Sequence, residues 1–248
     1  MLASFDEQWQ ASDDYWNEKR NDDAPTAATL RNEAQSIADA LLKHLYNDQG
    51  EYAGTWKLRH QDGRTLQIRH SWDFMNAGTF LADDLSPDQR QQMRDWFVGN
   101  LMRLRSDDVW VIAQDPRDGN NGPHQMEHNG RGAYPAWPFH DGWALKAMGF
   151  YPDVVDLLRV IDGITRMGPI GQGYDPTGRR CRSNWVNASG ATAAAYLTRN
   201  VFDIAPNLDD FSPRPRLGNL DPNACFENVP VRGKLYRVTA HGAKLIKP

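Results

Sequence analysis

Hydrophobic residues recur at intervals of three and four along most of the chain, which is the spacing of one face of an α-helix. The longest such stretch includes Leu30, Ile37 and Leu41, and it predicts a helix over residues 28–47. The same spacing predicts further helices over residues 71–83, from Pro87 to near Arg105, and over 136–148, 153–166 and 187–203. The pattern therefore predicts a mainly α protein with about six helices.

Short and long connections alternate between these helices. Ser86 is a preferred N-cap and Pro87 suits the first helical position, so the helices on either side of this short turn should lie antiparallel. Polar loops over 106–132 and 168–184 separate the helical pairs, with a period of about 65 residues. Repeated helical hairpins favour a solenoid or toroid. The helix starts near residues 71, 136 and 186 are therefore predicted to meet on one face, where the chemistry is expected.

Two segments have β character instead. Residues 51–69 read as a small hairpin around Asp62-Gly63, and the last forty residues alternate as short strands, most clearly over 233–239. The chain is thus predicted to divide into three parts. These are an aromatic linker segment over 1–25, a helical-hairpin domain over 26–205, and a tail with short strands over 206–248.

Composition and charge narrow the class of protein. The chain has 248 residues, of which 40% are hydrophobic and 24% charged, so it is globular, and its net charge of −4 with no long basic run argues against a nucleic-acid partner. No apolar stretch is long enough to cross a membrane, and no signal peptide is visible, so a cytoplasmic protein is expected. Cys181 and Cys225 fit no metal motif. Nine Trp residues are more than usual and suit stacking against flat ligands.

Four passages resemble the six-hairpin glycosidases, the (α/α)6 toroid glycoside hydrolases of bacteria. They are FDEQWQASDDYW at Phe5–Trp16, IRHSWDFMNAG at Ile68–Gly78, GAYPAWPFHDGWALKAMG at Gly132–Gly149 and GPIGQGY at Gly168–Tyr174. The terminal FENVPVRGKLYRV at Phe226–Val238 looks like the short β-region that closes several of these enzymes.

The resemblance implies both a fold and an activity. Such enzymes usually carry an N-terminal β-sandwich and twelve toroid helices, so this chain resembles their C-terminal half or a reduced member. The implied fold is an incomplete α/α toroid with a small C-terminal β-region. The implied activity is hydrolysis of glycosidic bonds in an oligosaccharide or polysaccharide, without metal or organic cofactor. A missing N-terminal half or a second copy of the chain is the protein partner that this reading allows.

Three carboxylates are the candidate catalytic residues, because glycoside hydrolysis needs a general acid and either a base or a nucleophile. Asp73 begins a helix, whose dipole favours the ionised form and suits a base. Asp141 lies beside His140 in an apolar setting that raises the pKa of an acid, and Glu127 lies in a long loop rich in titratable groups. Asp73 and Glu127 also have ordinary structural explanations, as a helix-start acid and as a solvated loop residue.

Aromatic and imidazole side chains near the predicted face are candidate substrate-binding residues. The apolar face of a pyranose packs on an indole, while its hydroxyl groups need polar neighbours. The candidate platforms are Trp56, Trp72, Trp137 and Trp185, and the candidate polar or aromatic partners are His70, His128, His140 and Tyr174. Packing in the helical core explains each Trp equally well when it is taken singly.

Alternative functions remain open from the sequence. His124 and His128 invite a metal site, but Gly and Pro place them in a loop rather than on the helix that a zinc motif needs. A toroid sugar epimerase or isomerase would use a His pair drawn from His70, His128 and His140. A non-catalytic glycan-binding half-toroid, or a gene fragment, is the third hypothesis. Arg69 and Arg131 are candidate ligands for an acidic sugar, although a role at the surface explains both more simply.

Overall fold

A computed structural model describes most of the chain. The described residues are 13–19, 23–105, 108–115, 117, 134–166, 173–174, 180–182, 187–205, 211–217 and 221–247. The chain divides into two compact units, Met1–Tyr46 and Asn47–Pro248. Within the described residues, the structure contains no helix with the length and apolar character needed to cross a membrane.

The first unit is dominated by helix α2 (Ala27–Leu45), which confirms the predicted helix over 28–47. Its N-cap is Thr26, whose hydroxyl accepts a hydrogen bond from the backbone N–H of Thr29. Residues 13–19 are also helical, and Arg31 on α2 forms an ion pair with Asp13 at 2.7 Å. This pair joins the two helical segments of the unit.

A small antiparallel sheet precedes the main helices. Its strands are β1 (Tyr46–Asn47), β2 (Thr55–Arg59) and β3 (Thr65–Ile68), and a 3-10 helix (Gly50–Tyr52) lies between the first two. Strands β2 and β3 pair from Trp56 opposite Ile68 to Arg59 opposite Thr65. The predicted hairpin around Asp62-Gly63 is therefore confirmed.

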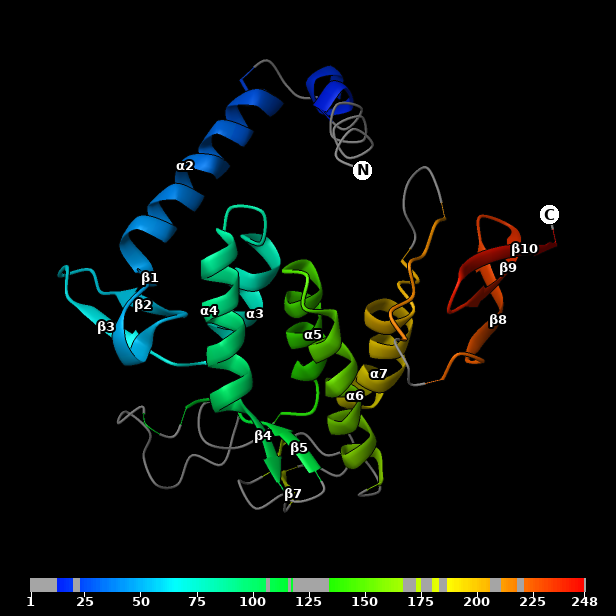
Figure 1. Ribbon diagram of the computed structural model, residues 1–248. Helices are drawn as coiled ribbons and strands as arrows, with labels where there is room; N and C mark the ends of the chain where they lie inside the picture. Colours follow the sequence, from blue (N-terminus) through cyan, green and yellow to red (C-terminus); the bar gives the residue numbers. More distant parts are fainter. Residues whose placement is uncertain are drawn as a thin grey trace. The chain divides into compact units, whose positions relative to one another are not determined.

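Helices α3 and α5 run parallel and pack directly against each other (Figure 1). Near their first turns, the rings of Trp72 and Trp137 lie 5.6 Å apart. Towards their other ends, a Cβ atom added to Gly78 would lie only 2.8 Å from the Cβ of Ala144, so this close approach requires glycine. The helices of this unit are α3 (Ser71–Phe80), α4 (Pro87–Trp96), α5 (Trp137–Ala147), α6 (Tyr151–Arg166) and α7 (Asn187–Ala195).

Capping signals in the sequence set several helix boundaries. Ser86 and Gln89 form a complete capping box at the start of α4, with Pro87 at the first helical position, as the sequence indicates. A tight turn with a left-handed Gly149 (φ 94°) joins α5 to α6. The paired helices with short turns confirm a mainly α protein, whereas closure into a toroid and the three-part domain division remain predictions.

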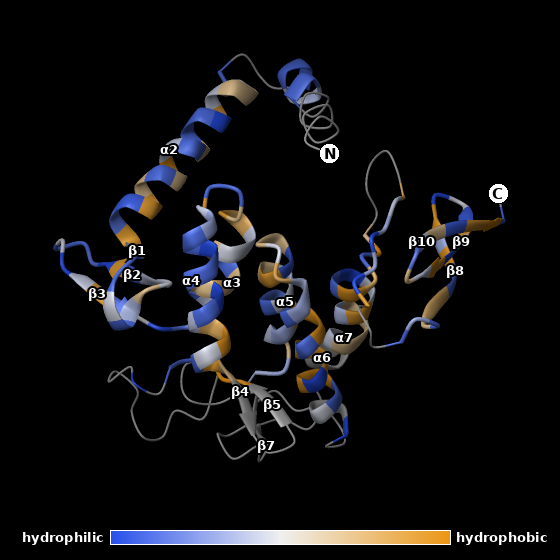
Figure 2. Cartoon of the chain, viewed as in Figure 1, coloured by the Kyte–Doolittle hydropathy of each residue, from blue (hydrophilic) through white to orange (hydrophobic). Residues whose placement is uncertain are grey.

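One helix ends earlier than the periodicity predicts. Helix α4 is hydrophilic and gives way at its more hydrophobic end to a π-helix (Phe97–Leu101), as Figure 2 shows. The chain then forms strand β4 (Met102–Arg105), which pairs with β5 (Asp108–Val111). The predictions of a helix to near Arg105 and of a loop from residue 106 are wrong here. The segment MRLR also alternates with the period of a strand, and pairing with β5 selects that alternative.

Short β segments also replace part of the second predicted loop, and the last helix changes type. Strands β6 (Gly173–Tyr174) and β7 (Arg180–Arg182) pair within the predicted loop over 168–184. Helix α7 continues as a π-helix (Tyr196–Val201), so helical structure ends two residues before the predicted boundary at 203.

The C-terminal tail forms the predicted β-region. Strands β8 (Cys225–Val231), β9 (Lys234–Thr239) and β10 (Gly242–Lys247) make an antiparallel sheet in the order β10-β9-β8. Both residues of the Arg232-Gly233 turn have positive φ, which suits a tight hairpin. Phe226 on β8 makes an edge-on ring contact with Phe202, with centroids 4.7 Å apart, and this contact joins the sheet to the end of the helical region.

Candidate functional site

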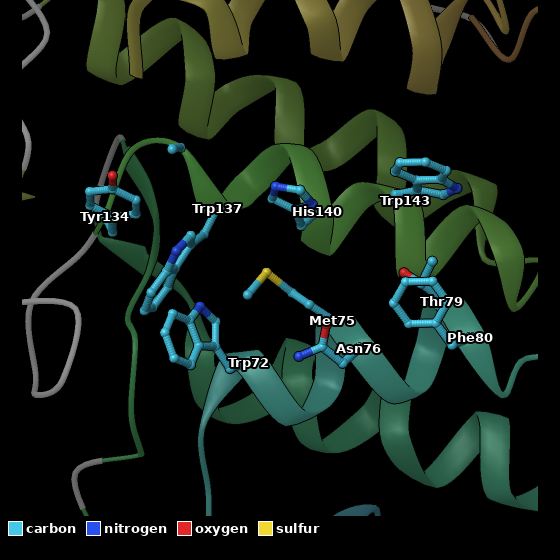
Figure 3. A pocket seen from close by; sticks show the side chains of 10 residues that line it. Trp72, Met75, Asn76, Thr79, Phe80, Tyr134, Trp137, His140 and Trp143 are labelled. Carbon is cyan, nitrogen blue, oxygen red and sulfur yellow. The ribbon is translucent and has the colours of Figure 1, made fainter. Parts of the chain in front are cut away.

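A cavity of about 600 Å³ lies between α3 and α5 (Figure 3). Five of its lining residues follow one face of α3 at helical spacing, and most of the others come from the first turns of α5. The lining residues are Trp72, Met75, Asn76, Thr79, Phe80, Tyr134, Ala136, Trp137, His140 and Trp143. The wall is thus largely aromatic, with a few polar groups, which is the usual composition of a ligand site.

The starts of α3 and α5 come together, as the repeat pattern predicts. His70 is the N-cap of α3, and its Nδ1 accepts a hydrogen bond from the backbone N–H of Trp72 at 3.0 Å. The His70 ring also contacts the rings of Trp72 and Trp137, with centroids 5.8 and 5.4 Å apart. His70 therefore orients the first turn of α3, but it is not a cavity-lining residue.

The two indoles at this end of the cavity differ in exposure. Trp72 is 50% exposed, whereas Trp137 is only 6% exposed and packs with Met75 and Ala113. Trp72 thus offers an open face to a ligand, and Trp137 supports it from the core. The structure places both predicted platforms on the cavity, although their role in binding stays a prediction.

His140 contributes the imidazole of the cavity. It lies at the exposed side of α5, and partial desolvation lowers its pKa below the usual value. The neutral ring therefore predominates at pH 7, and it can both donate and accept a hydrogen bond. These properties suit contact with sugar hydroxyl groups.

Asp73 lies in the first turn of α3 and directly follows the cavity residue Trp72 in the sequence, but it does not line the cavity itself. Burial raises its pKa from 3.8 to about 6, so desolvation outweighs the helix dipole that favours the ionised form. The carboxylate still predominates at pH 7, by about ten to one. A carboxyl group with a pKa near the working pH is well suited to accept a proton.

Asp141 is completely buried behind the cavity-facing side of α5. Among the described residues, neither of its carboxyl oxygens has a hydrogen-bond partner, and burial raises its pKa well above the usual value. The neighbouring Tyr196 donates its hydroxyl hydrogen to the backbone oxygen of Val154. The direction of the pKa shift agrees with the sequence-based expectation, but Asp141 does not line the cavity.

The remaining predicted site residues are not brought to the cavity by the described part of the chain. Trp56 is buried in β2, where it packs as a core residue. Arg69 is also buried, with its guanidinium 3.7 Å above the ring of Tyr52, so it does not face the cavity as a ligand for an acidic sugar would. Tyr174 lies in β6. The predictions for Glu127, His128, Arg131 and Trp185 lie outside the described residues.

Several cavity residues were not predicted from the sequence. Asn76, Thr79 and Phe80 follow Trp72 at intervals of four, seven and eight residues, so helical spacing from that Trp could have found them. Trp143 stands six residues after Trp137 and is 40% exposed. It also follows the predicted residue His140 by three residues, so helical spacing places both on the same side of α5.

Within the part of the chain that the structure describes, no three His, Cys, Asp or Glu side chains lie together in the way that metal ligands do. The loop with His124 and His128 lies outside the described residues.

The chain folds into a mainly α arrangement of helical hairpins, and this fold is similar to that of an enzyme of known structure. The neutral trehalase Nth1 from Saccharomyces cerevisiae matches with a TM-score of 0.55 and 14% sequence identity, over 70% of this chain and 31% of that chain. A likeness at this identity shows the fold alone, and the match spans less than a third of the trehalase. No protein family profile matches the sequence, and no curated protein matches it.

Proposed function

We propose that the protein is a carbohydrate-active protein that binds an oligosaccharide in the cavity between α3 and α5 and hydrolyses a glycosidic bond. The observation that carries this proposal is the cavity wall, where the exposed indoles of Trp72 and Trp143 stand beside Asn76 and His140. Indole faces pack against the apolar faces of pyranose rings, and the polar groups bind hydroxyls. Two observations support an incomplete α/α toroid as the scaffold. The fold is similar to that of a trehalase, and helices α3 and α5 of this chain run parallel.

The proposed chemistry uses carboxyl groups. Asp73, with its pKa of about 6, takes the role of the base that activates water. The acid that protonates the leaving oxygen comes from Glu127 or Asp141. Burial keeps Asp141 protonated, as an acid must be, whereas its position off the cavity wall favours Glu127.

A second function is favoured by one specific observation. Among the described residues that line the cavity, none is a carboxylate. This wall suits a non-catalytic glycan-binding protein as well as an enzyme. A sugar epimerase that uses a His pair receives less support, because the Nδ1 of His70 serves as the N-cap acceptor of α3.

The experiment incubates the purified protein with trehalose and with neutral oligosaccharides, and follows sugar release. Asp73→Asn, Glu127→Gln and Asp141→Asn are assayed one at a time, with Asp88→Asn as the control, because Asp88 is an exposed acid in the first turn of α4. Loss of hydrolysis in Asp73→Asn and in one other variant, but not in the control, supports the proposal.

Three other outcomes separate the alternatives. Full activity in all three variants would contradict hydrolysis by these carboxylates. Binding of oligosaccharide without turnover selects the glycan-binding function. Conversion of a free sugar without a change in mass selects the epimerase or isomerase.

A further inference from the structure

Aromatic side chains gather at both ends of the cavity rather than around one point (Figure 3). The proximal end is formed by Trp72, Trp137 and Tyr134, beside the starts of α3 and α5. The distal end is formed by Phe80, at the last residue of α3, and by Trp143, in the middle of α5. Two separate aromatic platforms therefore face the same cavity.

The distance between the two ends exceeds what one sugar ring covers. From Trp72 to Phe80 the helix rises by about 12 Å, and from Trp137 to Trp143 by about 9 Å. Atoms of a stacked ring lie only about 3.5–4 Å from the surface they contact. A single pyranose that stacks on Trp72 therefore leaves the distal platform empty.

The distal platform is open and held in place. Phe80 is 78% exposed and Trp143 is 40% exposed, and both line the cavity, so together they form an exposed apolar patch of the kind that marks a binding surface. The guanidinium of Arg199 lies 5.5 Å from the centroid of the Trp143 ring. Arg199 does not line the cavity, so it contacts Trp143 from outside and leaves the cavity side open to a ligand.

Polar groups lie between the two platforms. His140 and Asn76 occupy the middle of the cavity in Figure 3, and Thr79 lies beside the distal end. An amide, a neutral imidazole and a hydroxyl each donate and accept hydrogen bonds, which matches the hydroxyl groups on either side of a glycosidic link.

We infer that the cavity contains two aromatic sugar subsites and takes a linear saccharide of at least two rings, with one ring on Trp72 and another on Trp143 and Phe80. This inference rests on the proposed sugar-binding function. It adds the minimum length of the ligand, and it separates Trp143 and Phe80 from Trp72 as a second subsite.

The test measures the affinity of the purified full chain by isothermal titration calorimetry for glucose and for gluco-oligosaccharides of two and three units, both α- and β-linked. The variants are Trp143→Ala and Phe80→Ala at the distal subsite. Trp16→Ala is the matched control, because Trp16 is 41% exposed, close to the 40% of Trp143, and lies in the other unit.

The wild type should bind the longer saccharides more tightly than glucose. The Trp143→Ala change should weaken binding of the two- and three-unit saccharides about tenfold, the factor that corresponds to about 1.4 kcal/mol, and leave glucose binding unchanged. Phe80→Ala should act in the same direction, and Trp16→Ala should have no effect. Because Phe80 is so exposed, its loss should leave the fold intact.

Two different failures can be told apart. Binding of all lengths with equal affinity, or an equal loss for glucose and longer saccharides in Trp143→Ala, would overturn the second subsite but keep sugar binding. No binding of any saccharide would overturn the proposed function together with the subsite.

Discussion

The buried carboxyl group of Asp141 should make the stability of the protein fall as the pH rises. Its side chain is 0% exposed, and its two oxygens have no partner among the described residues, so the folded state strongly prefers the protonated form. In the unfolded chain the same group ionises near its ordinary pKa. The folded state therefore binds more protons than the unfolded state between these two pKa values, and the free energy of unfolding decreases with pH over that window.

The magnitude follows from proton linkage. One proton that only the folded state holds changes the free energy of unfolding by about 1.4 kcal/mol per pH unit. Asp73 also lowers the free energy of unfolding as the pH rises, over the narrower range from 3.8 to about 6, by about 3 kcal/mol in total. The Asp141→Asn variant removes only the first contribution, so the difference between variant and wild type isolates Asp141.

The assay is urea unfolding, followed by circular dichroism and Trp fluorescence, from about pH 4, near the ordinary pKa of the carboxyl group, to about pH 8. The variant should be close to the wild type at the acid end, with a cost of about 1–3 kcal/mol at most for its extra amide donor. As the pH rises, the free energy of unfolding of the variant should exceed that of the wild type by about 1.4 kcal/mol more for each pH unit, until the pH reaches the raised pKa of Asp141. Asp141→Leu should show the same pH dependence, and stability curves that run parallel for wild type and both variants would refute the reasoning.

Three further predictions concern the helices and the proposed base. His70→Ala removes the N-cap of α3, so it should cost about 1 kcal/mol of stability and should weaken sugar binding. Ser86→Ala at the N-cap of α4 should cost as much stability without affecting binding. Equal effects of the two variants on binding in calorimetry would contradict this prediction. Gly142→Ala should cost about 1–3 kcal/mol of stability in urea unfolding, because the new Cβ would lie 2.4 Å from a ring carbon of Tyr196. Gly99→Ala is the control, because a Cβ at Gly99 would meet open space. Equal losses of stability in the two variants would contradict this prediction. The hydrolysis rate of the wild type should rise with pH through about 6, because Asp73 ionises there. Asp73→Asn should lose this rise. A variant with the same dependence of rate on pH as the wild type would exclude Asp73 as the base.

The helices could largely be predicted from the sequence, because the signals that specify a helix lie within its own residues and its caps. Amphipathic spacing marks α2, and the capping residues around Ser86 mark the start of α4. The end of α4 could not be placed, because MRLR fits both a helix and a strand. Its pairing with Asp108–Val111 depends on a contact between segments that the local pattern does not contain.

The candidate site could be predicted only where helix starts meet. Trp72, Trp137 and His140 were found because the repeat places their helix starts on one face, and the structure puts all three on the cavity. Phe80 and Trp143 lie at helical spacing from Trp72 and His140, so they share a face with predicted residues, but spacing alone does not tell whether that face lines a cavity or packs in the core. Asp141 shows the converse, since its sequence neighbours predicted an apolar setting but not that it would be sealed off from the cavity wall.

The central claim is that the cavity between α3 and α5 binds sugar, and indole N–H resonances test it most directly. The protein is labelled with ¹⁵N, its Trp signals are assigned by single substitutions, and a three-unit gluco-oligosaccharide is added. The signals of Trp72 and Trp143 should shift on binding, while that of Trp16, an exposed Trp in the other unit, should stay in place. Saccharide binding with unchanged Trp72 and Trp143 signals would contradict the account.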